Sequence, residues 1–171
     1  MRKLKYNDPW EVAIGNGFRF LTRADIENII KELHIDRNRF HEYSKQHYQE
    51  IIRKFLFTFS YITNYTAQST ISLALNSINF RSELKSENID CYYRTRCWSE
   101  YIKTIKESIP ENEQKLFLIL GEGWVYEGEI EEMFRVLNEV TYLKDFYIVS
   151  PKFTWFIAVS DMEDSATIYN R

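Results

Sequence analysis

The pattern of hydrophobic residues is most regular in the last third of the chain. A continuous apolar run over 115–120 ends at Gly121, which predicts a short buried strand. Beyond it, apolar residues recur at intervals of three and four, which predicts an amphipathic crossover helix over about 128–140. The residues that share the apolar face of this helix are Tyr126, Ile130, Met133, Phe134, Leu137 and Val140.

Two more strands are predicted after this helix. Apolar runs over 146–149 and 153–159 are separated by Pro151, which favours a turn. Because a helix separates the runs 115–120 and 146–149, these two strands could form one parallel, right-handed βαβ step. Alternate residues of a strand share a face, so Trp155 is predicted to be a core residue. The residues expected on its face are Phe153, Ile157 and Val159.

The N-terminal third has the pattern of three helices. Asp8 precedes a proline, which is typical of a helix start, and the Gly-Asn-Gly step at 15–17 ends this helix. A second helix is predicted to begin at Thr22, and a third to run over about 37–59 after a cap at Asp36. The apolar face of the second helix is Ile26, Ile29, Ile30 and Leu33, and that of the third includes Phe40, Tyr43, His47, Ile51, Phe55 and Phe59.

The middle of the chain is less regular. Small polar residues after Tyr61 favour a loop, and the alternation over 71–76 fits either an amphipathic strand or a poor helix. The stretch 81–90 is charged and is expected to be exposed. A helical pattern then returns and stops at Pro110, and its apolar residues are Trp98, Tyr101, Ile102, Ile105 and Ile109.

Composition supports a packed protein. A chain of 171 residues is expected to form one globular domain over 1–171 and to bury roughly two-thirds of its unfolded surface. Its start lacks the apolar stretch of a signal peptide, and no apolar run reaches about 18 residues. We therefore predict a soluble cytoplasmic α+β protein, in which N-terminal helices precede a mixed, mainly antiparallel sheet with one crossover helix.

The net charge of −3 hides an uneven distribution. Residues 1–60 hold 11 basic and 8 acidic residues, residues 61–110 hold 6 and 5, and residues 111–171 hold 5 and 12. The acidity is therefore concentrated in the sheet-forming part. Such an asymmetry bears on the kind of partner that a protein attracts rather than on its fold.

Candidate catalytic and metal-binding residues are few. His47 and Glu50 have the helical spacing of two metal ligands, but nothing obvious supplies a third, and His47 falls in the predicted apolar face. We therefore expect no metal and no cofactor. Cys91 and Cys97 are expected to be free thiols in a reducing cytosol, because their spacing fits neither a disulfide framework nor a redox motif.

Two other segments could bind phosphate or nucleic acid. The Gly-Glu-Gly at 121–123 lacks the Lys-Ser/Thr of a phosphate-binding loop, so a turn is predicted. The segment 92–98 interleaves aromatic residues with Arg94 and Arg96, a composition that could stack on bases. A pI near 5.7 and the lack of a wider basic stripe argue against nucleic acid, and favour packing roles for Tyr92 and Trp98.

Three stretches of the C-terminal part resemble a family of small uncharacterised bacterial proteins. They are W-V-Y-E-G at 124–128, the stretch 132–137 that ends in V-L, and F-Y-I-V-S-x-x-x-x-W at 146–155. The pattern is more loosely similar to the SMI1/KNR4-like immunity-type proteins that neutralise secreted bacterial toxins. This resemblance implies an intracellular α+β binding protein rather than an enzyme. Members of the first family often carry a histidine-containing segment after the tryptophan-bearing strand, whereas 160–164 has no histidine here.

Two functions from different classes follow from these observations. The first is an immunity-type, non-catalytic protein that binds a basic protein partner, such as a toxin domain, through an acidic face and does not bind membranes. The second is an enzyme whose site gathers His41 or His47 with carboxylates from distant segments; a regulatory domain is a further alternative. The residues predicted to form the acidic partner surface are Glu127, Glu131, Glu139, Asp161, Glu163 and Asp164.

Overall fold

The computed structural model describes seven ranges of the chain, with side chains from Thr22 onward. The helix predicted after Asp8 and the segment 71–76 lie outside the described residues. Among the described residues, no helix is long and apolar enough to cross a membrane. The described ranges are 18–44, 46–61, 83–110, 112–121, 123–143, 145–160 and 164–171.

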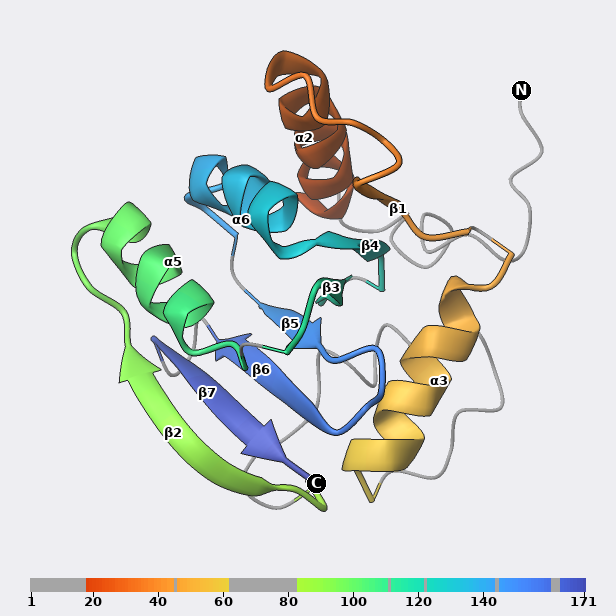
Figure 1. Ribbon diagram of the computed structural model, residues 1–171, viewed down its shortest axis with the longest axis vertical. Coiled ribbons are helices and arrows are strands. Elements are labelled where there is room, and N and C mark those ends of the chain that lie inside the picture. Colours follow the sequence, from red (N-terminus) through yellow and green to blue (C-terminus); the bar gives the residue numbers. More distant parts are fainter. Residues whose placement is uncertain are drawn as a thin grey trace.

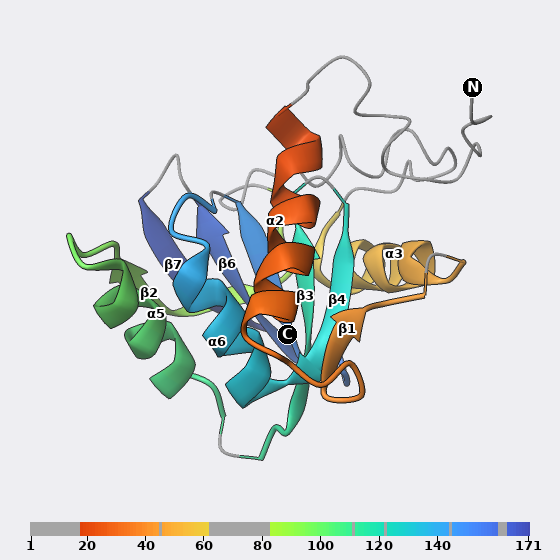
Figure 2. The ribbon, with the colours of Figure 1, turned by 90° about the horizontal axis from the view of Figure 1, so that it is seen from above.

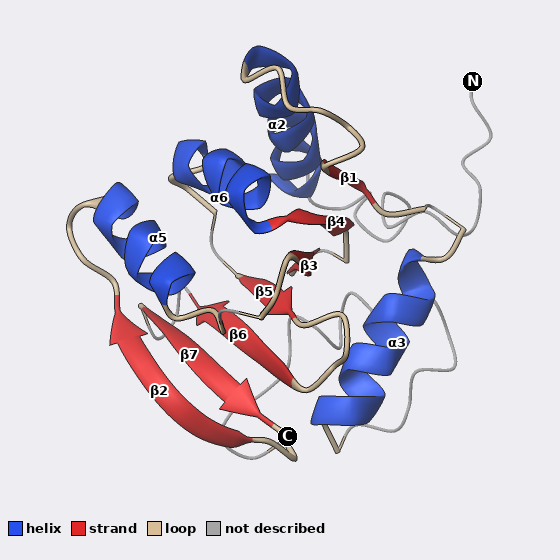
Figure 3. Cartoon of the chain, viewed as in Figure 1, coloured by secondary structure: helices blue, strands red, loops and turns tan. Residues whose placement is uncertain are grey.

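A seven-stranded sheet forms the centre of the molecule (Figures 1 and 3). Every neighbouring pair of strands is antiparallel, in the order β1-β4-β3-β5-β6-β7-β2. The predicted α+β class is therefore confirmed. The strands are β1 (Phe40–Glu42), β2 (Glu87–Tyr93), β3 (Lys115–Leu120), β4 (Val125–Glu129), β5 (Phe146–Val149), β6 (Trp155–Ser160) and β7 (Ser165–Asn170).

Helices cover both faces of this sheet (Figure 2). Their inner side chains form two hydrophobic cores, one between the sheet and α2, α5 and α6, and the other between the sheet and α3. The central strands of the sheet are therefore enclosed, and β3, β5 and β6 are apolar on both faces. The helices are α2 (Phe18–Glu32), α3 (Tyr48–Phe59), α5 (Trp98–Glu107) and α6 (Ile130–Glu139).

The helix predicted over 37–59 is wrong in its first half. Helix α3 begins at Tyr48, and Phe40 lies in strand β1, where its ring stacks on Tyr126 at 5.5 Å. Asp36 accepts a hydrogen bond from the N–H of Asn38, so it stabilises a turn rather than a helix start. The spacing of the aromatic residues fits a helix, but pairing with β4 makes this segment a strand because tertiary contacts override local propensity.

The predicted parallel step is also wrong. Tyr126 belongs to strand β4 rather than to the following helix, and β4 pairs with β3, where the N–H of Gly123 donates to the carbonyl of Leu120. This additional strand reverses the chain, and β5 consequently pairs with β3 in the antiparallel direction. The helix predicted over 128–140 is present as α6, and it begins directly after β4.

Three smaller differences concern element ends and exposed segments. Helix α2 begins at Phe18, one turn before the predicted start at Thr22, which is buried inside the helix. Phe153 has a φ of 55° in the turn before β6, and it packs in the core under α3, whereas Trp155 lies in the other core. Residues 87–90 are exposed as predicted, but they belong to strand β2, which the charged sequence did not indicate.

Candidate functional site

Helix α6 presents acidic residues on the outside of the molecule because its apolar residues turn inward. Met133, Phe134 and Leu137 are buried against the sheet and the neighbouring helices. Glu131 and Glu139 consequently lie on the outer surface of the helix. Glu131 is in the first turn, where the helix dipole favours negative charge.

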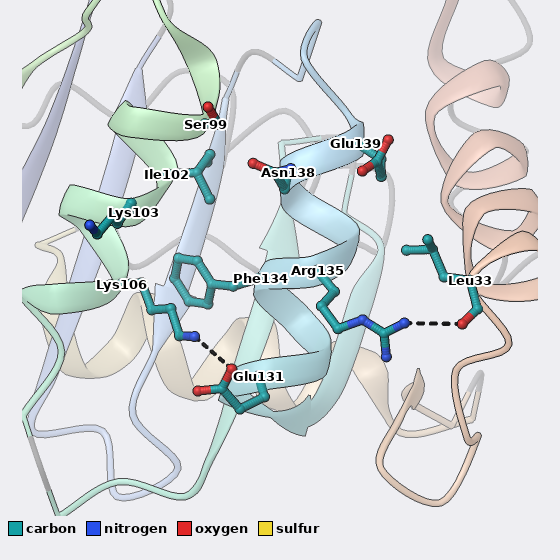
Figure 4. A pocket seen from close by; sticks show the side chains of 10 residues that line it. All are labelled: Leu33, Ser99, Ile102, Lys103, Lys106, Glu131, Phe134, Arg135, Asn138 and Glu139. Carbon is teal, nitrogen blue, oxygen red and sulfur yellow. Dashed lines mark hydrogen bonds and ion pairs between the residues drawn. The ribbon is translucent and has the colours of Figure 1, made fainter.

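A groove of about 340 Å³ lies between α5 and α6 and reaches the end of α2 (Figure 4). Ile102, Phe134 and Leu33 contribute apolar atoms to it, each from or beside a different helix. Polar and charged side chains surround these apolar atoms, a composition that resembles a small protein-binding site. The charged residues that line the groove are Lys103, Lys106, Glu131, Arg135 and Glu139.

Two polar contacts hold the walls of the groove together (Figure 4). The ammonium group of Lys106 in α5 lies 2.6 Å from a carboxylate oxygen of Glu131 in α6. Arg135 donates a hydrogen bond of 3.1 Å to the main-chain carbonyl of Leu33, just after α2. Glu139 lies at the opposite end of α6, and no ion pair to it is found among the described residues.

Two further acidic residues, at the start of α6, form ion pairs with arginines of the protein. Glu132 is only 4% exposed. Its carboxylate lies 2.6 Å from the guanidinium group of Arg39 and 2.6 Å from that of Arg135. Arg39 also lies 2.8 Å from Glu129. These ion pairs attach the turn before β1 to α6. Part of the acidity of residues 111–171 therefore serves the fold and is not available to a partner.

The structure brings Asp164 close to the C-terminal end of α6. Arg94 lies 3.9 Å from the Asp164 carboxylate and donates a hydrogen bond of 3.3 Å to the carbonyl of Thr141. One guanidinium group thus joins the β6–β7 turn to the segment that follows α6. The predicted surface residues Asp161 and Glu163 lie outside the described residues.

Glu127 lies on the other side of the sheet. It is in β4 opposite Phe117, and cross-strand partners share a face. Because Phe117 belongs to the core under α3, Glu127 also faces that side. The structure therefore separates Glu127 from Glu131 and Glu139, since the helix predicted to carry all three begins only after β4.

The three histidines lie in different elements. His34 follows α2 with a φ of 52°, His41 is in β1, and His47 immediately precedes α3. His47 is exposed, so its predicted place in an apolar helix face is wrong, because the buried face of α3 starts at Tyr48. Among the described residues, no group of three His, Cys, Asp or Glu residues is arranged to hold a metal ion.

The two cysteines are free thiols, as the sequence predicted. Cys91 is half-buried and accepts a hydrogen bond of 3.4 Å from the Thr167 hydroxyl. Cys97 is exposed at the start of α5, and its sulfur lies 3.2 Å from the Ser99 hydroxyl. This hydrogen bond lowers the pKa of the Cys97 thiol.

The segment 92–98 has packing roles. Trp98 donates a hydrogen bond of 2.9 Å to the carbonyl of Leu137 and packs against the core, as does Tyr92. The guanidinium group of Arg94 lies 5.1 Å from the centre of the Trp98 ring. Tyr92 and Trp98 are therefore used within the protein, in agreement with the packing roles predicted for these two residues, whereas Tyr93 is exposed.

A polar cluster between α2, β1 and β4 was not predicted from the sequence. Arg23 forms two hydrogen bonds with Glu42, at 2.9 and 2.5 Å. Glu27 accepts hydrogen bonds from Arg37 at 2.8 and 3.2 Å and from the Tyr126 hydroxyl at 3.1 Å. No sequence signal could reveal it, because the predicted helix over 37–59 would direct Arg37 and Glu42 away from α2.

Burial and pairing shift the pKa values in this cluster. Partial burial raises the pKa of Glu27, but the hydrogen bonds and charge of Arg37 outweigh it, so the pKa is lowered. Burial raises the pKa of the Tyr126 hydroxyl, and the Glu27 charge adds to this. Arg23 also lies 5.0 Å from the centre of the Trp124 ring. The cluster therefore anchors two residues of the W-V-Y-E-G motif to α2.

Gly128 completes the structural role of this motif. A Cβ atom at this position would lie 2.3 Å from the carbonyl oxygen of Arg39 and 2.6 Å from the Cα of Phe40. Only glycine lets β1 approach β4 this closely. Trp155, at the end of the third quoted stretch, is buried in the core with Ile157 and Val159. These residues of the quoted stretches therefore have structural roles, in packing and in strand pairing.

These observations define an α+β protein in which an antiparallel seven-stranded sheet lies between helices and an amphipathic groove opens beside α6. The chain belongs to a family of unknown function, DUF6756, whose model matches residues 19–171. No curated protein and no solved structure matches the chain. Membership of a family of unknown function agrees with the uncharacterised nature of the proteins that the chain resembles, while their bacterial origin and the likeness to SMI1/KNR4-like proteins stay predictions.

Proposed function

We propose that this protein is a non-catalytic binding domain of the immunity type, which binds a basic partner protein such as a toxin domain. The groove between α5 and α6 is the proposed binding site. Its arrangement is the observation that carries the proposal, because apolar atoms from three helical segments lie between charged side chains on an otherwise well-packed molecule. A partner side chain that entered the groove would contact Ile102 and Phe134, which are 3% and 4% exposed.

The carboxylates of Glu131 and Glu139 are the groups that would attract a basic partner to this groove, which Lys103, Lys106 and Arg135 also line. Glu139 lies at its open end, and Arg94 holds Asp164 beside the segment that follows the same helix. At the other end, the ammonium group of Lys106 forms an exposed ion pair with the Glu131 carboxylate. An exposed pair of this kind contributes about 0–1 kcal/mol, so an incoming Arg or Lys can replace Lys106 at little cost. The proposed acidic surface thus consists of Glu131, Glu139 and Asp164.

The proposal is tested with the partner captured from a native cell lysate, or with the product of a neighbouring toxin gene. The test variant is Glu131→Lys with Glu139→Lys, and the matched control is Glu50→Lys, an exposed residue in the first turn of α3 on the opposite side of the sheet. Surface changes of this kind typically alter the free energy of unfolding by about 0.5 kcal/mol or less each. All three proteins should therefore melt at similar temperatures.

Association rates measured at low salt distinguish the outcomes. The double variant should associate at least about tenfold more slowly than the wild type, because like charges now repel a basic partner. The control should associate at the wild-type rate, and raising the salt concentration should slow the wild type most. A double variant that associates as fast as the control, with the same salt dependence, would show that these carboxylates are only solvated surface charges.

A further inference from the structure

Among the described strands, β2 lies at one edge of the sheet. It pairs with β7 and stands last in the strand order, and Figure 1 shows it at the outer limit of the molecule. Most of its residues are exposed, and two of them are large hydrophobic residues, Ile89 at 60% and Tyr93 at 75% exposure. An edge of this length presents main-chain N–H and C=O groups that can pair with a strand of another molecule.

The direction of the main-chain groups follows from one hydrogen bond. The N–H of Arg94, just after β2, donates to the carbonyl of Asp164 at 2.8 Å and therefore points toward β7. Successive residues of a strand direct their main-chain N–H groups to opposite sides. The N–H of Tyr92 therefore also points toward β7, whereas the N–H groups of Cys91 and Tyr93 point to the open edge.

The side chain of Asp90 forms a hydrogen bond with one of these two outward N–H groups, that of Cys91. One of its carboxylate oxygens accepts the N–H of Cys91 at 2.8 Å, and the other accepts the Tyr92 hydroxyl at 2.8 Å. The Tyr92 contact holds the carboxylate in place over the edge. For the N–H of Tyr93, no side-chain acceptor is found among the described residues. A strand that paired with this edge would need the N–H of Cys91 as a hydrogen-bond donor, and Asp90 now accepts that hydrogen bond.

The charges of the strand indicate what the edge would pair with. An acidic residue, Glu87, stands at its start, and a basic residue, Arg96, follows its end. Asp90 lies in the middle of the strand, and Arg94 contacts Asp164. In an antiparallel pair of two β2 strands, the acidic start of each strand lies beside the basic end of the other. This arrangement is self-complementary, as a two-fold interface between identical chains requires.

We propose that the open edge of β2 is a self-association surface for a second copy of this chain and that Asp90 holds it closed. The carboxylate of Asp90 removes the Cys91 N–H from the edge and thereby interrupts the ladder that two β2 strands would form. Releasing this carboxylate opens the edge to antiparallel pairing. The proposal concerns a surface formed by β2 and does not depend on the binding function proposed for the α5–α6 groove.

The first test compares Asp90→Ala with Asp90→Asn by sedimentation velocity at a protein concentration of about 0.1 mM, in the range of weak self-association. Asp90→Ala should increase the dimer fraction relative to the wild type. Asp90→Asn should sediment as the wild type does, because its side-chain oxygen still accepts the Cys91 N–H. No dimer with Asp90→Ala overturns the proposal. An equal increase with Asp90→Asn also overturns it, since the negative charge rather than the hydrogen bond would then keep the copies apart.

A charge exchange tests the identity of the partner. In the Asp90→Ala protein, Arg96→Glu should weaken the dimer because it places two negative charges side by side. Adding Glu87→Arg should restore the dimer, since the complementary pair is then present with its signs reversed. Failure of the second change to restore association excludes antiparallel pairing of two β2 strands and indicates unspecific aggregation.

A third measurement does not depend on the folding of any variant. In the wild-type protein, amide hydrogen exchange should be at least about tenfold slower at Cys91 than at Tyr93, because a hydrogen bond to a charged acceptor protects the first amide. Both amides point to the same open edge, so Tyr93 serves as the internal control. Equal protection of the two amides overturns the role of Asp90.

Discussion

Replacement of Gly128 by alanine is the most direct test of how the first edge of the sheet is built. The added Cβ would lie 2.3 Å from the Arg39 carbonyl oxygen and 2.6 Å from the Phe40 Cα, so two main-chain groups would have to move. Phe40 could then not keep its stack on Tyr126 at 5.5 Å. Movement of Arg39 would also weaken its contact of 2.6 Å with the buried Glu132.

The expected loss can be stated from these contacts. Overpacking in a well-packed site typically costs about 1–3 kcal/mol, and we expect the upper end, about 3 kcal/mol, because main chain rather than a flexible side chain must move. For a protein of this size, about 3 kcal/mol corresponds to a fall in melting temperature of roughly 6–12 °C. The assay is urea denaturation followed by tryptophan fluorescence, supported by thermal melting.

The neighbouring residue supplies the control for this prediction. Glu127 belongs to the same strand but its side chain points to the opposite face, toward the core under α3. Glu127→Ala removes side-chain atoms and forces no main chain to move, so it should lower the free energy of unfolding by about 1 kcal/mol or less. If Gly128→Ala is as stable as the control, β1 does not approach β4 as the structure shows, and the role assigned to this glycine is refuted.

Three further predictions concern the core, the polar cluster and the exposed thiol. Trp155→Ala should lower the free energy of unfolding by about 3–5 kcal/mol in urea denaturation, and near-wild-type stability would contradict the core role of this residue. The lowered pKa of Glu27 stabilises the folded state above the ordinary pKa near about 4.3, and this contribution is lost as the pH falls through the lower value in the folded protein. The stability lost in Glu27→Gln should therefore be full at about pH 7 and smaller at about pH 3, whereas a pH-independent difference would refute the assignment. Ser99→Ala should raise the pKa of Cys97, because it removes the hydrogen bond to the sulfur. Alkylation rates measured against pH in a Cys91→Ser background should then show a midpoint at higher pH. An unchanged midpoint would contradict the hydrogen bond.

Several elements could be predicted from the sequence because their pattern reflects burial on one side of a single element. The helix that contains Tyr101 and Ile105 is present as expected, and the apolar run at 115–120 is strand β3. Helix α6 follows the predicted spacing from Ile130 onward. For the two helices the hydrophobic period is long enough to indicate a helix without knowledge of the neighbours, whereas the run at 115–120 is identified as a strand by its short length and by the glycine that ends it.

The candidate site was predictable only in part. The sequence located acidic residues near the C-terminus, and two of them, Glu131 and Glu139, line the groove. Sequence could not show that Glu132 is buried between two arginines or that Glu127 lies across the sheet. The sequence shows how many charged residues a segment holds. Which of them form ion pairs depends on the segments that the fold brings within a few ångströms of each other.

By itself, the sequence determined the class of this protein, the buried strands β3, β5 and β6 and the inner faces of α5 and α6, since each follows from a local pattern. Only the tertiary structure decided strand β4 and the two edges of the sheet. Strand β1 has the aromatic spacing of a helix and β2 is charged and exposed, so neither has a local strand signal. Each becomes a strand because a neighbour, β4 or β7, pairs with its main chain. Hydrogen bonding between distant segments, rather than hydrophobic period, is the physical reason that these strands form.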